Sequence, residues 1–539
     1  MIVLTFIFIL SIFTAACSGN ETTKKVEKGE KGTLSEPQKG GSLVIGSTST
    51  PTILNSLYST DSTSSDMEAF IYNALLKTNE KFEEDYDLAE DVEESPDGLT
   101  YTVKIRKGVK FHDGVELTAD DVVFTYNIPL HPDYNGERGT NFEMLKEIKK
   151  LDNYTVEFKL KRKDATFKPN TLSSFHILPE HILKDVPVKD LGKNKFNFKS
   201  PIGTGPYKFV EWKEGEYLKF EAFDDYYDGR ANLDTLTVKI IPDGNAAIAQ
   251  LQAGDINFFP GVTSMDLDTV KGFNGLKVES GLGLSYSFIG WNQKKEMFKD
   301  KNVRHALTMA IDRQEIVDTI MNGDGEVAHV PESPLSWAYS DEVRKFKYDP
   351  EEAKTLLKAA GWKDTDKDGY LVKDGKRFSF TLKTNKGNKL REDAVVVIQQ
   401  QLKEIGIEVK PQIVENSALI KQLMPPNWDY DAVVMGWSLS TFPDTYDIFH
   451  SSQIERGFDF VWYKNEKADK LMIDARQILD RDEYKNAYID IYKEIAEDQP
   501  YTFLYYPNVH HAMPENLHRP VFHAKQDFYQ IEKWWLEQK

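Results

Sequence analysis

The fold of this chain is decided by residues 101–127, which read YTVKIRKGVKFHDGVELTADDVVFTYN. The first part alternates apolar and polar side chains with period two around Tyr101, Val103 and Ile105, and this alternation predicts a hairpin strand. After Thr118, a residue type that favours the N-cap position, the pattern becomes helical. The stretch therefore predicts a strand followed by a helix, as in a mixed α/β protein.

Strands and helices continue to alternate along the rest of the chain. Apolar strands are predicted at residues 40–46, 378–385 and 429–437. Residues 302–321 have the spacing of one amphipathic helix, residues 351–360 form a second helix stopped at Gly361, and a last helix is predicted near residues 482–497. Because 539 residues exceed what one hydrophobic core usually covers, the alternation predicts an α/β protein with two main lobes.

Composition excludes some classes of protein. Hydrophobic residues make up 40% and charged residues 28%, which is ordinary for a folded soluble protein. The net charge of −19 argues against a nucleic-acid partner, which needs a basic face. After the N-terminus no stretch approaches 18 consecutive apolar residues, so no transmembrane helix is expected there.

The N-terminus has the pattern of an exported lipoprotein. Residues 1–13 are almost wholly apolar but too short to span a bilayer, as in a secretory signal. Thr14, Ala15 and Ala16 then precede Cys17, the only cysteine, in an order that resembles a bacterial lipobox. We predict a signal peptide at 1–16, a lipid on Cys17, and a polar, flexible tether at 17–41. The alternative is an ordinary secretion signal with an incidental cysteine.

The sequence lacks the motifs of common enzymes. It contains no His-Glu-x-x-His zinc motif, no Gly-x-Ser-x-Gly elbow, no Walker loop and no dinucleotide fingerprint. The eleven histidines are scattered, and the single cysteine is assigned to the anchor. We therefore predict a protein that is not an enzyme and requires no cofactor.

One motif resembles a metal site. Asp364, Asp366 and Asp368 alternate before Gly369, which matches the first half of a calcium loop. The twelfth position, where a bidentate Glu belongs, is Gly375. The segment is thus a candidate structural calcium site, and the alternative is a polar hairpin that links a helix to the strand at 378–385.

Residues 101–127 and four further stretches, in the same order, resemble the solute-binding proteins of the peptide/nickel class, family 5, which feed ATP-driven importers. The four stretches are residues 203–212, 302–317, 351–362 and 398–410. The resemblance runs from about residue 40 to the C-terminus and is closest to the oligopeptide-binding lipoproteins of that family. It implies a periplasmic-binding-protein type II fold with a hinge. Lobe I then comprises residues 42–80, 201–295 and 506–539, with a subdomain inserted at 81–200, and lobe II comprises residues 296–505.

The same resemblance implies a receptor without bond chemistry. It would capture oligopeptides between two closing lobes and deliver them to the permease subunits of an ABC importer. We expect a monomer held by its lipid on the extracytoplasmic face of the cell membrane. The alternatives are a receptor for a nickel chelate, an opine or an oligosaccharide, and a peptide-sensing surface protein with no role in transport.

A receptor for many peptides has to bind their backbone, which a strand edge can do. The expected edge follows the strand at 429–437, because α/β ligands usually bind at the carboxyl ends of strands. A second edge is expected after the first strand, and aromatic side chains are expected to form the walls. The predicted residues are Gly436, Trp437, Ser438, Leu439 and Ser440; Ser47, Thr48, Ser49 and Thr50; and Tyr286, Trp291, Trp337, Phe442, Tyr505 and Tyr506. For Trp291 and Tyr505 the alternative is a place in the core.

Two positions depart from the family pattern. Short-peptide members have an Asp soon after the Gly-Trp pair, where this chain has Ser440. Some members place an Arg two residues before that Gly, where this chain has Val434. Without fixed charges for the two peptide termini, we predict longer and variable peptides, with Asp444 as a candidate replacement for the missing acid.

Overall fold

The stretch at 101–127 folds as its pattern predicts. The computed structural model describes residues 36–455 and 457–538, and Pro37–Lys539 form one unit. Strand β5 (Thr100–Ile105) buries Tyr101, Val103 and Ile105 completely. Helix α2 (Ala119–Asn127) is capped by Thr118, whose hydroxyl accepts from the Asp120 N–H while the Asp121 carboxylate accepts from the Thr118 N–H. The predicted signal peptide, Cys17 and most of the tether lie outside the described residues.

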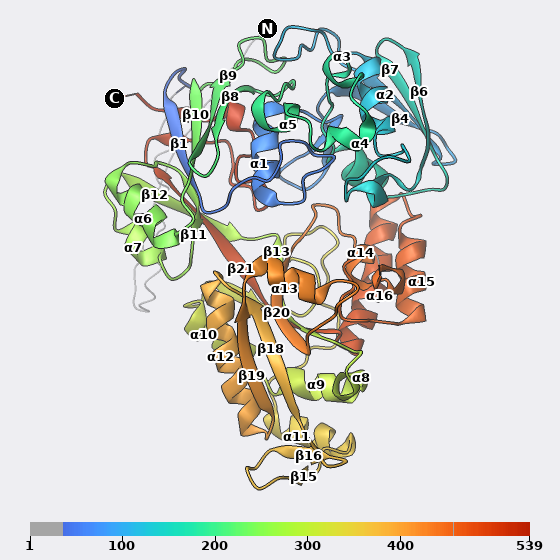
Figure 1. The fold of residues 1–539 in the computed structure, drawn as a ribbon, viewed down its shortest axis with the longest axis vertical. Helices are drawn as coiled ribbons and strands as arrows, with labels where there is room; N and C mark the ends of the chain where they lie inside the picture. The colour runs from blue at the N-terminus through green and yellow to red at the C-terminus, as the bar shows by residue number, and fades with distance from the viewer. Residues whose placement is uncertain (1–35, 456, 539) are drawn as a thin grey trace, which may run out of the picture. The chain divides into compact units, whose positions relative to one another are not determined.

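Residues 36–282 and 507–538 are called lobe I here, and residues 283–506 lobe II. Lobe I contains two four-stranded sheets (Figure 1). The first has the order β1 (Ser42–Ser47), β10 (Thr235–Ile240), β9 (Tyr217–Ala222) and β8 (Tyr207–Lys213). The second has the order β4 (Ala89–Glu94), β5, β7 (Thr155–Leu160) and β6 (Leu145–Asp152), within the predicted insertion.

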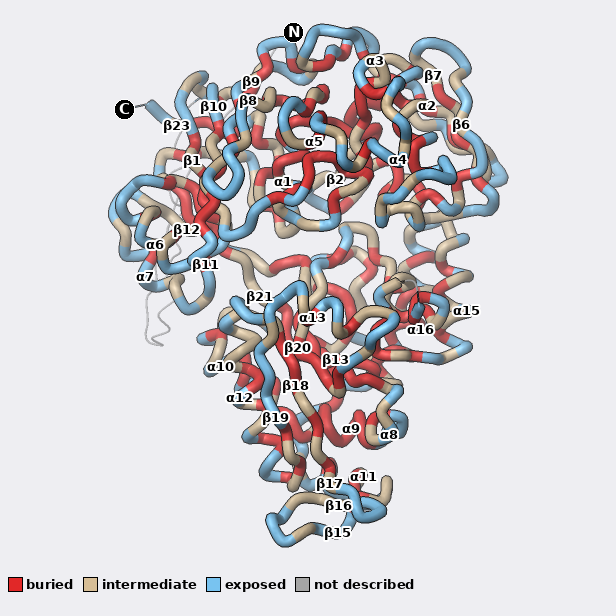
Figure 2. The backbone as a smooth tube through the Cα atoms, viewed as in Figure 1, coloured by how far each residue is buried: buried red, intermediate tan, exposed pale blue. Residues whose placement is uncertain are grey.

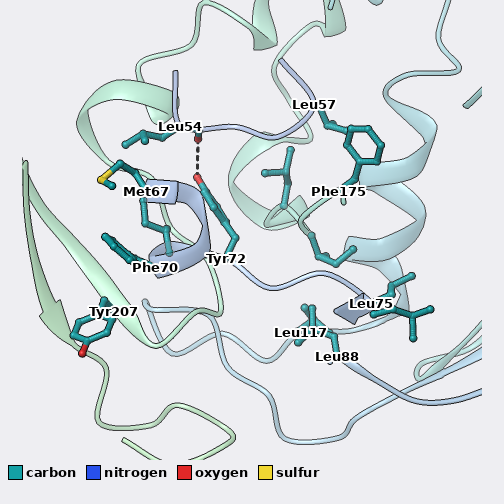
Figure 3. Packing of buried hydrophobic residues seen from close by; sticks show 14 of the residues in the cluster. Leu54, Leu57, Met67, Phe70, Tyr72, Leu75, Leu88, Leu117, Phe175 and Tyr207 are labelled. Atoms are coloured by element: carbon teal, nitrogen blue, oxygen red, sulfur yellow. Dashed lines mark hydrogen bonds between the residues drawn. The ribbon is translucent and has the colours of Figure 1, made fainter. Parts of the chain in front are cut away.

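The two sheets of lobe I share one hydrophobic core. Figure 3 shows residues of the first part of the chain, such as Met67 and Phe70, in the same cluster as Leu117 and Phe175 of the insertion. The Tyr72 hydroxyl satisfies its buried donor by donating to the Leu54 carbonyl at 3.1 Å. The insertion therefore stabilises lobe I rather than standing apart from it.

Both ends of the described chain meet in lobe I. The Gln538 side chain donates to the Lys39 carbonyl at 3.1 Å, and the short strands β22 (Leu517–His518) and β23 (Trp535–Leu536) pair near the C-terminus.

Lobe II is built on the sheet order β21, β13, β20, β18 and β19. Its strands are β13 (Ser285–Trp291), β18 (Ser379–Asn385), β19 (Glu408–Val414), β20 (Ala432–Ser438) and β21 (Tyr501–Pro514). Alternate residues enter two cores: Ile289 and Val434 pack with helices on one face, and Phe288 and Val433 on the other. Figure 2 shows the central strands β13 and β20 largely buried, and the edge strand β19 and the segment at β15–β17 largely exposed. Strand β13 belongs to this sheet, so the chain enters lobe II before the predicted boundary at residue 295.

Two stretches connect the lobes. Strand β12 (Leu276–Leu282) pairs with the C-terminal half of β21, and β13 directly follows it and pairs with the N-terminal half. Strand β11 (Phe259–Val262) also pairs with β21, and so does β14 (Gly325–Val327). Strand β21 therefore runs continuously from one lobe into the other (Figure 1).

The helices largely match the predicted ranges, with one correction. The expected single helix at 302–321 is two helices, because the Asp312 carboxylate accepts from the Glu315 N–H at 3.0 Å and caps a new helix. No helix within residues 36–455 and 457–538 is long and apolar enough to cross a membrane. The longer helices are α1 (Ser62–Ile71), α2, α6 (Gly244–Ala253), α9 (Lys301–Met309), α10 (Arg313–Ile320), α11 (Pro350–Ala359), α12 (Lys389–Glu404), α13 (Asn416–Leu423), α15 (Glu466–Ala475) and α16 (Arg481–Asp498).

Candidate functional site

A pocket of about 360 Å³ lies at the carboxyl end of β20, and we call it the strand-edge pocket. Strands β13, β20 and β21 and the first turn of α12 supply its lining. Five of the predicted residues line it, namely Tyr286, Gly436, Trp437, Ser438 and Tyr505, together with Ser285, Ser287, Asn388, Leu390, Arg391 and Pro507. The pocket thus gathers residues separated by more than 200 positions, as the ends of neighbouring strands in an α/β sheet do.

One edge of β20 is unpaired over this pocket. Strand β13 pairs with β20 as far as Ser438. On the other side, the pairing of β18 with β20 ends at Val434. Among the described strands, none pairs with the second edge of Met435–Ser438. Backbone donors and acceptors of these residues are therefore available to a ligand in an extended conformation.

Gly436 is required at this place by its neighbours. A Cβ atom there would lie 2.3 Å from an Arg391 guanidinium nitrogen and 2.9 Å from the backbone oxygen of Tyr286. The missing side chain lets the guanidinium approach the strand edge closely.

Arg391, at the start of α12, is the main residue of the site that sequence reasoning missed. Its Nη1 donates to the Asn385 side chain at 3.0 Å, and its buried Nε makes no hydrogen bond within the described residues. No carboxylate of the described chain pairs with it. Burial lowers the pKa of the guanidinium, since a charge taken out of water without a counter-ion is disfavoured. The pocket therefore contains a cation without a counter-ion in the described chain. Val434, at the position where some family members have an Arg, had suggested that the site carries no positive charge.

An aromatic cluster lies beside the strand-edge pocket, on the face of the sheet that carries Phe288. Trp437 stacks over Phe288 with ring centroids 6.3 Å apart, and its indole N–H donates to the Tyr501 hydroxyl at 3.3 Å. Tyr286 is buried, its hydroxyl has no partner within the described residues, and burial raises its pKa. Tyr286, Phe288 and Tyr501 are packed inside lobe II, so Trp437, which is only partly buried, is the ring of this cluster with apolar area left for a ligand side chain.

A second cavity, which we call the aromatic hollow, lies where the inserted subdomain meets lobe II. It includes the predicted residues Trp337 and Phe442. Its lining is Phe82, Glu84, Glu94, Tyr101, Asp164, Ala165, Lys168, Pro169, Trp337, Phe442, Ile478, Leu479, Arg481 and Tyr484.

The loop between the two cavities touches lobe I. The Lys525 ammonium donates to the Ser438 hydroxyl at 2.7 Å, and the Ser440 hydroxyl donates to the Asn170 side chain at 3.4 Å. Leu439 is buried, and its N–H donates to the Leu284 carbonyl at 2.9 Å. The segment after the free edge of β20 therefore contacts both lobes. Such contacts are expected beside a site that two lobes enclose.

Three of the predicted groups lie elsewhere. Trp291 is wholly buried in the core of lobe II, where its indole N–H donates to the Thr502 hydroxyl at 3.1 Å. Tyr506 is also a core residue, and its hydroxyl donates to the Val330 carbonyl at 2.9 Å. The segment Ser47–Thr50, comprising Ser47, Thr48, Ser49 and Thr50, lies at the end of β1 and lines neither cavity.

Asp444 does not replace the missing acid. Its carboxylate accepts from the Arg476 guanidinium at 2.5 Å and from the Tyr488 hydroxyl at 3.1 Å. With these partners in the interior of lobe II, it is not free for a ligand's amino terminus.

The aspartates of the predicted calcium loop form a hairpin. Strands β15 (Asp364–Thr365), β16 (Leu371–Lys373) and β17 (Lys376–Arg377) pair in order. Arg377 donates to Asp366 at 2.6 Å and to Asp368 at 2.5 Å, in the place a cation would take. Across the described residues no three or more His, Cys, Asp or Glu side chains form a group suited to a metal. The geometry favours the hairpin alternative, and calcium binding stays a prediction.

Comparison with known proteins agrees with the fold. Residues 85–459 match the family described as bacterial extracellular solute-binding proteins, family 5 Middle. The chain is 60% identical over 538 residues to the oligopeptide-binding protein AppA of Bacillus subtilis (strain 168), covering 99% of this chain and 98% of that protein.

Solved structures of relatives share the architecture. The structure of Bacillus subtilis AppA in complex with a nonapeptide has a TM-score of 0.86 and 62% identity, covering 93% of this chain and 100% of that one. The structure of NikZ from Campylobacter jejuni with Ni(L-His) has a TM-score of 0.82 and 29% identity, covering 92% and 99%. The fold is thus that of periplasmic binding proteins, and the chain belongs to family 5 of the bacterial extracellular solute-binding proteins, which bind ligands rather than catalyse reactions.

Proposed function

We propose that this chain captures oligopeptides outside the cell and delivers them to an ABC importer. The observation that carries the proposal is the unpaired edge of Met435–Ser438 above a pocket that also holds Arg391. A peptide backbone pairs with that edge whatever its side chains are, and the guanidinium attracts its terminal carboxylate. The likeness to a relative named as an oligopeptide-binding protein supports the same assignment.

The expected affinity is moderate. Each backbone hydrogen bond contributes a net of about 1 kcal/mol. Roughly six to eight such bonds, less the cost of ordering the peptide, correspond to dissociation constants on the order of micromolar. This range suits a receptor that has to release its ligand to a permease.

The first experiment is native mass spectrometry of the soluble body, purified without refolding. A spread of bound masses that dissociate into short peptides would support the proposal and give their lengths. A single non-peptide mass, such as a nickel chelate, would redirect the assignment to another small ligand. A protein that stays empty in the presence of a peptide library would contradict peptide capture.

The anchor and the transport role belong to the same proposal. Replacing Cys17 by Ala should release the protein from the membrane fraction and abolish its labelling by a fatty-acid analogue. Deleting the protein should lower the uptake of a labelled oligopeptide. Uptake that is unchanged by the deletion would favour the alternative of a peptide sensor without a transport role.

A further inference from the structure

The aromatic hollow has the size and the position of a side-chain site. Its volume is about 80 Å³, and since a water molecule needs only about 10–15 Å³, it has room for several atoms in a row but not for a whole peptide. The inserted subdomain contributes Glu94, Asp164 and Lys168, and lobe II contributes Trp337 and Arg481. A group bound here would therefore touch both bodies at once.

Its walls are aromatic. The rings of Trp337 and Phe442 lie 5.7 Å apart, those of Trp337 and Tyr484 also 5.7 Å, and those of Phe442 and Tyr484 4.8 Å. The Arg481 guanidinium already lies over the Trp337 ring, 4.4 Å from its centroid, so the cluster holds one cationic side chain of the protein itself. The remaining apolar surface can accept the methylene stem of a long ligand side chain.

The charges at the hollow are not balanced. Both cations have carboxylate partners: Arg481 pairs with Glu83 at 3.3 Å, and Lys168 pairs with Glu94 at 3.6 Å. Glu84 and Asp164 form no ion pair among the described residues.

Asp164 has only local hydrogen bonds. Its carboxylate accepts from the Thr166 hydroxyl at 2.8 Å and from the Thr166 N–H at 3.0 Å. Burial raises its pKa, and the hydrogen bonds from Thr166 and the nearby charge of Arg476 offset this effect only in part. The two carboxylates without an ion pair therefore leave the lining with an excess of negative charge.

We propose that the aromatic hollow binds a lysine or arginine side chain of the captured peptide, with its stem against Trp337 and Phe442 and its cationic head at Asp164 and Glu84. This inference rests on the proposed capture of oligopeptides and adds a preference for basic residues to it. The inserted subdomain, which supplies Asp164 and Glu84, then takes part in selecting the ligand.

The strand-edge pocket and the aromatic hollow are close enough for one peptide to reach both. Phe442 follows Ser438 by four residues, so their Cα atoms are at most about 15 Å apart. A peptide strand advances about 3.3 Å per residue, so roughly five residues suffice to pass from the strand edge to the hollow.

The test is isothermal titration of the refolded, peptide-free protein with nonapeptides of neutral polar sequence. Single Lys, norleucine, Phe or Glu residues are placed at successive positions. At one position Lys should bind about tenfold more tightly than norleucine, and Glu more weakly. In the double variant Asp164→Asn, Glu84→Gln this ratio should fall to about one. Glu90→Gln, an exposed carboxylate of the same subdomain, is the matched control and should keep the ratio.

The outcomes separate the two proposals. A wild-type protein that binds no nonapeptide contradicts oligopeptide capture itself. Three results overturn only the inference about the hollow. They are equal binding of all peptides, tighter binding of Phe than of Lys, and a preference for Lys that survives in the double variant. If the double variant unfolds, the single variant Glu84→Gln on exposed β3 (Glu84–Tyr86) should still lower the ratio several-fold, and an unchanged ratio there overturns the inference too.

Discussion

Replacing Arg391 by Gln should weaken the binding of peptides and leave the protein at least as stable as before. In the described chain the Arg391 guanidinium has one hydrogen bond, to Asn385, and no ion pair. Its burial therefore costs free energy that the empty protein does not recover, and removing the charge relieves that cost.

The size of the binding loss follows from the bond that we assign. A hydrogen bond to a charged group contributes about 1.5–3 kcal/mol. Since about 1.4 kcal/mol is tenfold in affinity, Arg391→Gln should raise the dissociation constant of a peptide acid about 10- to 150-fold. Amidation of the peptide's C-terminus should produce a loss of the same size in the wild type, and little further loss in the variant.

The assay is isothermal titration of both proteins with a peptide acid and its amide, together with thermal unfolding of the empty proteins. Arg377→Gln is the matched control, because Arg377 pairs with Asp366 and Asp368 in a hairpin remote from the pocket. It should lower the melting temperature and leave both dissociation constants unchanged. An Arg391→Gln protein that still prefers the acid over the amide by the wild-type factor would refute the assignment.

Three further predictions concern stability. Gly203→Ala should destabilise lobe I by about 1–3 kcal/mol or more in chemical denaturation, because its Cβ would lie 2.1 Å from the Ile71 carbonyl oxygen, whereas Gly244→Ala, with open space around it, should be neutral. Burial raises the pKa of Glu68 to about 8, so between about pH 4.5, its value in the unfolded chain, and pH 8 the folded state keeps a proton that the unfolded state has lost. The free energy of unfolding should therefore fall by about 1.4 kcal/mol per pH unit over this range. Glu68→Gln should remove this decline, and equal slopes of unfolding free energy against pH in both proteins would contradict the reasoning. Because Arg377 neutralises Asp366 and Asp368, adding EGTA should leave the melting temperature unchanged, and a higher melting temperature in calcium would show that a calcium site exists.

Local sequence patterns predicted the elements of the fold because their causes are local. The period-two burial of β5 and the capping of α2 by Thr118 depend on residues a few positions apart. The apolar spacing at 302–321 did not predict the break between α9 and α10, because the spacing continues through it. Only the capping side chain of Asp312 marks it, and Asp is also common inside the first turn of a helix.

The site shows where local patterns stop being informative. The chain has two Gly-Trp pairs on adjacent strands, Gly290-Trp291 and Gly436-Trp437, and both were predicted to supply a binding residue. Strands β13 and β20 run antiparallel, with Trp291 opposite Ala432 and Trp437 opposite Tyr286. The two Trp residues therefore lie at opposite ends of the sheet, and only Trp437 lines the strand-edge pocket.

The sequence by itself determined the alternation of strands and helices, the exported class of the chain and the strand that carries the site, since periodicity, caps and apolar runs act over a few residues. Only the tertiary structure decided which aromatic residues line the candidate site and which side chain brings a positive charge to it. The pairing of β18 with β20 places the start of α12 next to Gly436, and so brings Arg391 to a strand edge 45 residues away in the sequence. Strand order and direction, which no short stretch of sequence encodes, are the physical reason.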